Sequence, residues 1–404
     1  MGTVIYNARA SRRQMADSMT APGTGTPIAV ADGDRLAPEC LDLLRELVEC
    51  ESQTGDTRAN LHVAAILEAF LTRVGGQVER IEAPGYGDHL LARFPGKIQE
   101  SERPVLLLGH MDTVHPVGTL RELPFEVAGD RVRGPGVYDM KGGLAVSLFA
   151  LRLLAERGSG ARTGLTCMVT CDEEVGSLHS RERIQAEAGG HRAALVVEPS
   201  APGGAVKTRR KGVADYVLSV RGELAHAGIE PEAGASAIHE LARQICGVYD
   251  LSNPGAETTL NVGLVEGGTR SNVVARRASC TIDVRFFSNA EAERVEAALR
   301  SVRPRDPRCR LSVQGGVNRP ALEKTDASEA LYRAAAAVAA DLGFGVGEAS
   351  TGGASDGNLT AAVGCPTLDG IGPDGRGAHT LKEYIFREEV GRRIAFLARL
   401  IETL

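Results

Sequence analysis

The feature that most constrains the fold is an alternation of short apolar segments with helical periods. Between residues 104 and 200, the apolar runs PVLLLGH, TGLTCMVT and AALVVEPS are separated by segments with apolar residues at helical spacing. Continuous apolar runs of this length are typical of strands that are buried on both faces, as in parallel sheets covered by helices. The sequence therefore predicts an α/β fold with a mixed, parallel-rich sheet, in which ligands gather beyond the carboxyl ends of the strands.

A second pattern occupies residues 207–316. Here strand-like and helix-like segments follow in the order β-α-β-β-α-β, which is the order of a ferredoxin-like α+β domain. The α/β pattern resumes over residues 317–404, so the chain is predicted to contain a discontinuous α/β domain, residues 36–206 and 317–404, with an inserted domain. Residues 1–35 include the Gly-, Pro- and Thr-rich stretch TAPGTGTP and are predicted to form a flexible leader.

Composition and charge restrict the partners of this chain. A net charge of −6 offers no electrostatic attraction for nucleic acid or for an anionic membrane surface. No apolar run approaches the roughly 20 residues of a membrane span, so no membrane partner is predicted. The eight cysteines form no CxxC pair and the N-terminal region lacks the apolar core of a secretory signal, which predicts a reducing, cytoplasmic location.

Five polar clusters follow the apolar segments or lie in adjoining loops of the α/β parts. Their histidine and acidic residues are His110 and Asp112, then Asp139, then Asp172, Glu173 and Glu174, then Glu198, and finally His379. Taken singly, each cluster is more typical of an ordinary structural role, but together they fall where an open sheet builds its ligand site. Two imidazoles with several carboxylates suit Zn²⁺ and, less selectively, Mn²⁺ or Co²⁺. Since no thiolate is among them, open catalytic coordination is favoured over a closed structural site.

The number of donors suggests two metal ions. If Asp139 bridges a pair of ions about 3.5–4 Å apart, the remaining donors divide evenly between them. One division that completes both ions symmetrically is His110 with Glu198 and His379 with Glu174. Glu173 is then left over, and hydrolysis requires such a carboxylate as general base and later as proton donor. Asp112 follows His110 by two residues along an extended chain, which places it to orient the imidazole.

Seven motifs carry a resemblance to a known family. They are, in order, GHMDTV, GPGVYDMKGG, TCDEEVGS, VVEPS, GELAHAG, TGGASDGN and GAHTLKEYI. In this order they resemble the glutamate carboxypeptidase (carboxypeptidase G) branch of the co-catalytic zinc metallopeptidases. That family also contains acetylornithine deacetylase, succinyl-diaminopimelate desuccinylase and the aminoacylases. The resemblance covers residues 36–404 and implies two Zn²⁺ ions, for which Co²⁺ or Mn²⁺ could substitute.

The resemblance carries the ligand roles over to the same residues. It implies that His110 and Glu198 hold one zinc, Glu174 and His379 hold the other, Asp139 bridges, Asp112 orients His110 and Glu173 acts as the base. In the family the peptide bond after the bridging aspartate can be cis, and in this chain that bond precedes Met140. The glutamate at position 198 resembles the carboxypeptidase and acylase members, so aminopeptidase activity is disfavoured.

The inserted segment resembles the lid and dimerisation domain of that family, which implies a homodimer. His226 in GELAHAG corresponds to a histidine that family members contribute to the transition-state oxyanion, often across the dimer. Arg285 and Asn272 correspond to residues that receive the free α-carboxylate of the substrate, and the fork of an arginine suits a carboxylate. Gly353 lies in a loop that lines the substrate pocket in the family.

These features favour a dinuclear zinc hydrolase that cleaves an amide bond next to a free carboxylate, with a dipeptide or an N-acyl amino acid as the small-molecule substrate. A deacylase of an N-acyl amino-acid biosynthetic intermediate would use the same metals with a different pocket. An inactive metal-binding homologue with a binding or regulatory role is disfavoured because every expected position is filled. A cysteine hydrolase using Cys171 is weaker still, because the sequence places no histidine to activate the thiol.

Overall fold

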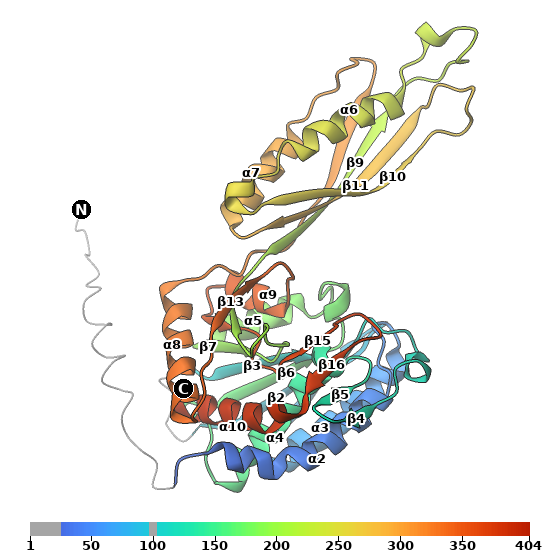
Figure 1. Ribbon diagram of the computed structural model, residues 1–404. Coiled ribbons are helices and arrows are strands. Elements are labelled where there is room, and N and C mark those ends of the chain that lie inside the picture. Colours follow the sequence, from blue (N-terminus) through green and yellow to red (C-terminus); the bar gives the residue numbers. More distant parts are fainter. Residues whose placement is uncertain (1–25, 97–102) are drawn as a thin grey trace, which may run out of the picture.

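The computed structural model describes residues 26–96 and 103–404, and this part of the chain forms a larger and a smaller lobe (Figure 1). The described part of the larger lobe has a central six-stranded sheet with the order β1-β2-β6-β3-β7-β14. The strands are β1 (Gln77–Ala83), β2 (Gly87–Phe94), β3 (Val105–His110), β6 (Leu165–Thr170), β7 (Ala193–Val196) and β14 (Thr367–Leu368). β6, β3, β7 and β14 run parallel, whereas β1 pairs antiparallel with β2 and β2 with β6. The predicted mixed, parallel-rich sheet is confirmed.

Helices cover both faces of this sheet, which explains why its strands are apolar throughout. Leu107 of β3 belongs to a core that includes residues of α2, α3, α4, α8 and α10, whereas Leu108 belongs to a core with α5 and α9. The helices are α2 (Val30–Glu49), α3 (Thr57–Arg73), α4 (Gly142–Glu156), α5 (Arg181–Gly190), α8 (Asp326–Asp341), α9 (Asp356–Ala362) and α10 (Arg387–Thr403). Because successive side chains of a strand point to opposite faces, every residue of β3 is buried.

The smaller lobe has the β-α-β-β-α-β order that was predicted for the inserted segment. Its elements are β9 (Gly212–Arg221), α6 (Ala237–Tyr249), β10 (Thr259–Gly267), β11 (Arg277–Phe286), α7 (Asn289–Arg300) and β12 (Arg310–Arg319). The antiparallel sheet has the order β10-β11-β9-β12 and has an apolar core of its own. Burial alternates along β11 because α6 and α7 cover one face of the sheet (Figure 1). The ferredoxin-like inserted domain is therefore confirmed.

Two short stretches of backbone connect the lobes and lie side by side. β8 (Val206–Arg210) pairs with β13 (Glu348–Thr351) in the larger lobe just before β9 begins. After β12, Leu322 and Arg210 exchange two backbone hydrogen bonds, each with an N–O distance of 3.1 Å. The predicted domain limits, residues 207 and 316, stay predictions and fall within β8 and β12.

A small sheet of the larger lobe frames two of the polar clusters. It has the order β15-β16-β5-β4 and consists of β4 (Glu126–Ala128), β5 (Arg131–Arg133), β15 (Gly375–Arg376) and β16 (Tyr384–Phe386). β5 leads into the loop with Asp139, and the loop with His379 lies between β15 and β16. Because β16 pairs with β5, two loops that are distant in the sequence are held together.

The predicted flexible leader is too long at its carboxyl end. Residues 1–25 lie outside the described residues, but α2 begins at Val30 rather than near Leu36. Gly33 lies so close to Gly391 of α10 that a Cβ atom would stand 2.0 Å from the Gly391 carbonyl oxygen. This close packing extends the helix through ADGD, a stretch whose composition by itself favours a turn.

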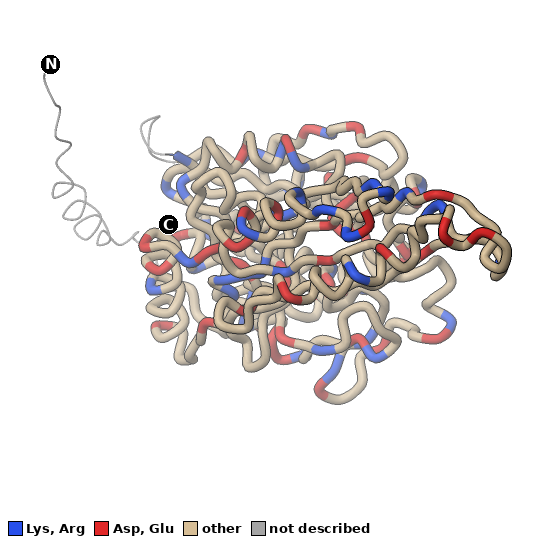
Figure 2. Tube along the Cα trace, turned by 90° about the horizontal axis from the view of Figure 1, so that it is seen from above, with Lys and Arg blue, Asp and Glu red and all other residues tan. Residues whose placement is uncertain are grey.

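Two further properties of the described chain concern its helices and its charged residues. No helix among the described residues is both long and apolar enough to cross a membrane. Basic and acidic residues are interspersed along the described trace (Figure 2). Charges of opposite sign therefore lie near one another over much of the molecule.

Candidate metal centre

The polar clusters meet at the carboxyl edge of the central sheet. His110 is the last residue of β3, Glu174 follows β6 and Glu198 follows β7. These strands are parallel neighbours, so their carboxyl ends lie together. The loop before α4 adds Asp139, and the loop between β15 and β16 adds His379. The structure thus brings all five predicted metal ligands into one place.

Asp139 stands between two pairs of side chains. Its Oδ1 lies 3.4 Å from Nε2 of His110, and its Oδ2 lies 3.2 Å from Nε2 of His379. On the first side, Oε1 of Glu198 lies 3.6 Å from Nε2 of His110. On the second side, Oε2 of Glu174 lies 3.3 Å from Nε2 of His379. Each oxygen of one carboxylate therefore faces its own histidine and glutamate. The peptide bond from Asp139 to the next residue is cis, as the family resemblance allows.

The donor atoms fit a divalent cation. Within the described residues, Nε2 of His110 and Oε1 of Glu174 are buried without a hydrogen-bond partner, an arrangement that is costly in a folded protein. One donor atom each from His110, Asp139 and Glu174 lies within 4.8 Å of the others, so this group includes one residue from each predicted ligand pair and the bridging aspartate. Cations on the two sides of Asp139 would satisfy both orphaned atoms, and nitrogen and oxygen donors of this kind suit zinc.

The pKa values of the histidines and of Asp139 in this cluster are shifted mainly by their oppositely charged neighbours. Burial alone would raise the pKa of Asp139, but the imidazoles of His110 and His379 hold that pKa well below its ordinary value. Hydrogen bonds from His379 to Asp139 and Glu174 raise the pKa of His379 to about 10. Burial would lower the pKa of His110, yet the surrounding carboxylates raise it well above its ordinary value. The carboxylates thus favour positive charge at the centre of the cluster.

Asp112 contacts His110 more closely through its backbone than through its side chain. Nδ1 of His110 lies 2.9 Å from the carbonyl oxygen of Asp112 and 3.4 Å from Oδ1 of its carboxylate. The Asp112 carboxylate accepts the backbone N–H groups of Glu173 and Glu174, both at 3.3 Å, and the hydroxyl of Thr54 at 2.7 Å. Asp112 therefore links the strand end with His110 to the loop that carries the two glutamates.

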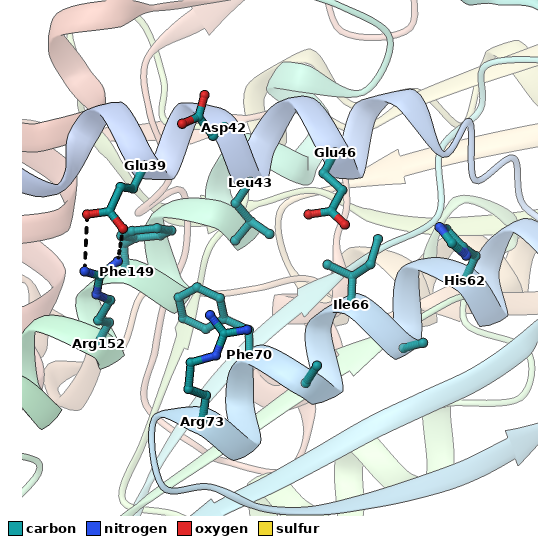
Figure 3. Close-up of a pocket in the computed structure, with 12 residues that line it drawn as sticks. Glu39, Asp42, Leu43, Glu46, His62, Ile66, Phe70, Arg73, Phe149 and Arg152 are labelled. Carbon is teal, nitrogen blue, oxygen red and sulfur yellow. Dashed lines mark hydrogen bonds and ion pairs between the residues drawn. The ribbon is translucent and has the colours of Figure 1, made fainter.

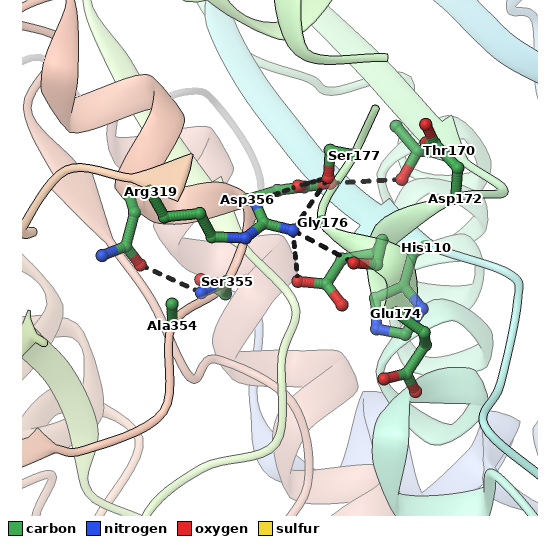
Figure 4. A network of polar contacts seen from close by, with 12 residues as sticks. His110, Thr170, Asp172, Glu174, Gly176, Ser177, Arg319, Ala354, Ser355 and Asp356 are labelled. Carbon is green, nitrogen blue, oxygen red and sulfur yellow. Dashed lines mark hydrogen bonds and ion pairs between the residues drawn. The ribbon is translucent and has the colours of Figure 1, made fainter. Parts of the chain in front are cut away.

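Glu173 is paired with an arginine that the sequence analysis missed. Nη2 of Arg319 donates to Oε1 of Glu173 at 2.9 Å, and Nη1 donates to Oδ1 of Asp356 at 2.8 Å. Figure 4 shows the Arg319 side chain directed toward Asp356 and Ser177. Burial raises the pKa of Glu173 well above its ordinary value, although Arg319 and His110 lower it. A buried carboxylate with a raised pKa is suited to take up a proton.

A second buried arginine, Arg210, was also missed. It ends β8 and binds Asp369 through two hydrogen bonds, from Nε at 2.8 Å and from Nη2 at 2.7 Å. Its Nη2 also lies 3.3 Å from Oε2 of Glu198. Arg210 and Arg319 belong to the two connectors between the lobes, so each connector contacts one carboxylate of the site. The one sequence feature that could have pointed to these two arginines is their position at the borders of the inserted segment, in RRKG and NRP.

Of the three predicted residues of the smaller lobe, the structure brings two together and places the third, Arg285, apart from them. His226 and Asn272 are neighbours, because the N–H of Ala227 donates to the carbonyl of Asn272 at 3.0 Å. They belong to the segments between β9 and α6 and between β10 and β11. These segments lie on the side of the smaller lobe that faces away from the larger lobe (Figure 1). Arg285 lies near the opposite end of β11, and its guanidinium binds Asp283 at 2.8 and 2.9 Å.

Two further predicted positions have local contacts. Gly353 lies between β13 and α9, and its carbonyl oxygen accepts a hydrogen bond from Nη1 of Arg210 at 3.2 Å. Asp172 accepts the backbone N–H of His179 at 2.7 Å. Asp172 therefore shapes the loop after β6.

The structure places a histidine beside Cys171 that the sequence analysis did not find. The Sγ of Cys171 lies 3.4 Å from Nδ1 of His89 on the neighbouring strand β2. Burial nevertheless raises the pKa of the Cys171 thiol and lowers the pKa of His89. Both groups therefore favour their uncharged forms, which does not support a thiolate nucleophile.

A groove elsewhere on the larger lobe is separate from the metal cluster. It lies between α2 and α3, with Leu43, Ile66 and Phe70 in its lining and Arg152 paired to Glu39 at one end (Figure 3). None of the predicted site residues lines this groove. The carboxyl edge of the sheet therefore stays the candidate site.

A two-lobed α/β chain with histidines and carboxylates at the carboxyl edge of its sheet defines a metal-dependent hydrolase. The family model of peptidase family M20/M25/M40 matches residues 106–403, and the chain belongs to this family. It is 32% identical over 377 residues to carboxypeptidase G2 of Pseudomonas sp. (strain RS-16), covering 91% of this chain and 89% of that protein. It is 29% identical over 413 residues to succinyl-diaminopimelate desuccinylase of Methylobacterium sp. (strain 4-46), covering 94% of this chain and 96% of that protein.

The fold is also similar to solved structures. Aminopeptidase PepT from Bacillus cereus ATCC 10987 superposes with a TM-score of 0.76 at 24% identity, covering 91% of this chain and 98% of that chain. At this identity the likeness supports the fold alone. The family resemblance drawn from the seven motifs is confirmed, and the chain is a hydrolytic metalloenzyme.

Proposed function

We propose that this chain is a dinuclear zinc hydrolase that cleaves an amide bond next to a free carboxylate. The observation that carries the proposal is the placement of Asp139, whose two oxygens lie 3.4 Å from Nε2 of His110 and 3.2 Å from Nε2 of His379. A carboxylate between two such groups is typical of two-metal hydrolytic sites. The donor set favours Zn²⁺, with Co²⁺ or Mn²⁺ as substitutes.

The ligand residues and Glu173 have separate tasks in this proposal. His110 and Glu198 would hold one cation, His379 and Glu174 would hold the other, and Asp139 would serve both. Divalent cations bound here supply acidification of water and polarisation of the substrate carbonyl. Glu173 accepts the proton that water releases as its oxygen adds to the amide carbon, and returns it to the leaving nitrogen as the carbon–nitrogen bond breaks. The products are a carboxylate and an amine.

The substrate class is supported by the relatives. The 32% identity to a carboxypeptidase supports a substrate with a free carboxylate next to the amide bond, such as a dipeptide. The motif resemblance adds an N-acyl amino acid and a C-terminal glutamate as candidates. The 29% identity to a desuccinylase supports a second candidate, a deacylase of an N-acyl amino-acid intermediate. Both candidates use the same ligands and Glu173 and differ in the pocket that receives the acyl group. An inactive homologue is not favoured, because Glu173 and all five ligand positions converge.

We also propose a homodimer in which the smaller lobes pair. β10 is an edge strand of the small sheet, and its Leu264 and Val265 are 67% and 60% exposed. Apolar side chains on an unpaired edge strand favour pairing with a second chain. In this dimer, His226 reaches the oxyanion in the partner's site, and Asn272 of the partner subunit joins Arg285 at the substrate carboxylate. The loop between β9 and α6, which carries His226, faces away from the larger lobe of its own chain (Figure 1). This position supports a role in the site of a partner chain.

The cysteines support the proposed cytoplasmic location. All eight are free in the described residues, and most are buried in apolar surroundings. Free thiols in this number are typical of a reducing compartment.

A panel of substrates tests the proposed function. Dipeptides and N-acyl amino acids are assayed with added Zn²⁺, each with its α-carboxylate either free or converted to the primary amide. We expect turnover of the free acids and its near loss for the amides, because a carboxylate binds an arginine fork in a way that a neutral amide does not. Equal turnover of both forms would contradict the carboxylate requirement, and the lack of any metal-dependent amide hydrolysis would contradict the proposal as a whole.

A further inference from the structure

Glu383 is a buried carboxylate outside the predicted ligand set, yet four hydrogen bonds converge on it. Its Oε1 accepts the backbone N–H groups of Tyr138 and Asp139, both at 2.9 Å. Its Oε2 accepts the N–H of Gly136 at 2.8 Å and a hydrogen bond from Nε2 of His115 at 2.7 Å. The side chain is 0% exposed. These bonds use about all four lone-pair sites of a carboxylate.

The four bonds join two of the sequence motifs, GPGVYDMKGG and GAHTLKEYI, and the residue directly after a third, GHMDTV. His115 follows β3, at whose end His110 lies, and Glu383 follows His379 by four residues. The loop of residues 136–139 carries the bridging aspartate. The pairing of β16 with β5 holds the segment of Glu383 beside this loop. One carboxylate therefore fixes the relative positions of the loops that present both histidines and the bridge.

We propose that Glu383 is the positioning residue of the bridging aspartate, holding the backbone of Asp139 so that its carboxylate is shared between the two histidine–glutamate pairs. The inference rests on the proposed function, because it assigns Glu383 a task toward the two cations. A bridge requires both oxygens of Asp139 to be placed at once, and they lie 3.4 and 3.2 Å from the two histidines. A small shift of the Asp139 backbone would bring its carboxylate closer to one histidine–glutamate pair and move it away from the other.

The chemistry of the contacts requires a carboxylate at position 383. Three of the four donors are backbone N–H groups, which cannot change into acceptors. A glutamine would accept with one atom only, and its NH₂ group would face two of the donors. Gly136 adopts a φ of 72°, a conformation that glycine favours, so the loop depends on bonds to an external acceptor as well as on its own sequence.

The test compares Glu383→Gln with wild type and with two further variants. His115→Ala removes one of the four bonds and keeps the proposal testable if Glu383→Gln does not fold. Glu389→Gln is the matched control, because Glu389 is a buried glutamate in the first turn of α10 whose carboxylate binds Arg392 and, at 2.9 Å, Arg393. Each protein is stripped with a chelator and titrated with Zn²⁺ and with Co²⁺ alone. Metal stoichiometry, dissociation constants, the Co²⁺ absorption spectrum and unfolding by urea are measured.

We expect wild type and Glu389→Gln to bind two ions per chain with matching Co²⁺ spectra. Glu383→Gln should lose about 10- to 100-fold in affinity for at least one ion and change the Co²⁺ spectrum, because residues that orient metal ligands have effects of this size. His115→Ala should show a smaller loss in the same direction. Both glutamine variants remove a buried carboxylate and are expected to lower the free energy of unfolding. Only a loss of metal ligand positioning should also change the Co²⁺ spectrum.

Two results overturn the inference. One is unchanged affinity and spectrum in Glu383→Gln, and the other is a change in Glu389→Gln as large as in Glu383→Gln. Failure of the proposed function gives a different result, since wild type itself would then bind fewer than two ions per chain.

Discussion

Arg319, the last residue of β12, donates from Nη2 to Oε1 of Glu173 at 2.9 Å. The same guanidinium binds Asp356 at the start of α9. The side chain that holds the proposed base therefore belongs to the connector through which the chain returns from the smaller lobe. The geometry of the base thus depends on residues from three separate parts of the sequence.

Replacing Arg319 tests this dependence. Lysine has a single ammonium group and cannot span Glu173 and Asp356 as a guanidinium fork does. We expect Arg319→Lys to lose about 1.5–3 kcal/mol of unfolding free energy, the range of a charge-assisted hydrogen bond. Turnover should fall on the order of 10²-fold, because a misplaced catalytic group has effects of this size. Urea unfolding and steady-state kinetics measure both quantities.

The control for this variant is Arg294→Lys in α7. Arg294 pairs with Glu291 on the surface of the smaller lobe, so the change should stay below about 1 kcal/mol. Turnover of Arg294→Lys should match wild type. Wild-type turnover in Arg319→Lys would show that the contact with Glu173 has no part in the reaction.

Glu173→Gln tests the assignment of the general base. The amide oxygen can still accept from Arg319, but the side chain can no longer take up a proton. We expect kcat to fall about 10²- to 10⁴-fold, as for the loss of a general base, while two ions per chain remain bound. Glu182→Gln, at an exposed position in α5, is the control and should keep wild-type activity. A Glu173→Gln protein with most of its turnover would refute the assignment.

Chelation and alkylation separate the metal mechanism from a thiol mechanism. We expect dialysis against a chelator to abolish turnover and added Zn²⁺ or Co²⁺ to restore it. Iodoacetamide should leave turnover intact, because burial raises the pKa of the Cys171 thiol and suppresses the reactive thiolate. Cys246 is exposed, so the alkylation is done on Cys246→Ser. Inactivation of this variant by alkylation, with resistance to chelation, would favour the cysteine hydrolase.

Mixing two inactive variants tests the proposed dimer. If His226 serves the partner's site, a chain with Glu173→Ala and a chain with His226→Ala form a mixed dimer with one intact site. After unfolding and refolding together, the mixture should regain roughly a quarter of wild-type activity, because half of the dimers are mixed and each has one working site. Each variant refolded alone is the control. No recovery in the mixture, with dimers present by ultracentrifugation, would place His226 outside the partner's site.

The sequence was sufficient to predict the strand ends that carry ligands. An apolar run that stops at a polar residue marks both a buried strand and its terminus, so His110 and Glu198 could be found from local pattern. The order of elements in the smaller lobe was readable for the same reason. The family resemblance then placed these residues in one site.

Contacts between distant segments could not be predicted in this way. The bond from Gly136 to Glu383 joins residues 247 positions apart, and the bond from Arg319 to Glu173 joins residues 146 positions apart. Neither leaves a periodic pattern in the sequence. The early start of α2 was missed because packing of Gly33 against Gly391 outweighs local propensity. The direction of the loop with His226 depends on how the lobes are joined, which periodicity does not encode.

Anomalous scattering from crystals of the zinc-loaded protein tests the central claim most directly. The account predicts two peaks at the zinc edge, one on each side of the Asp139 carboxylate, one beside His110 and the other beside His379. A single peak, peaks at other residues, or no peak in protein that elemental analysis shows to be metal-loaded would contradict it.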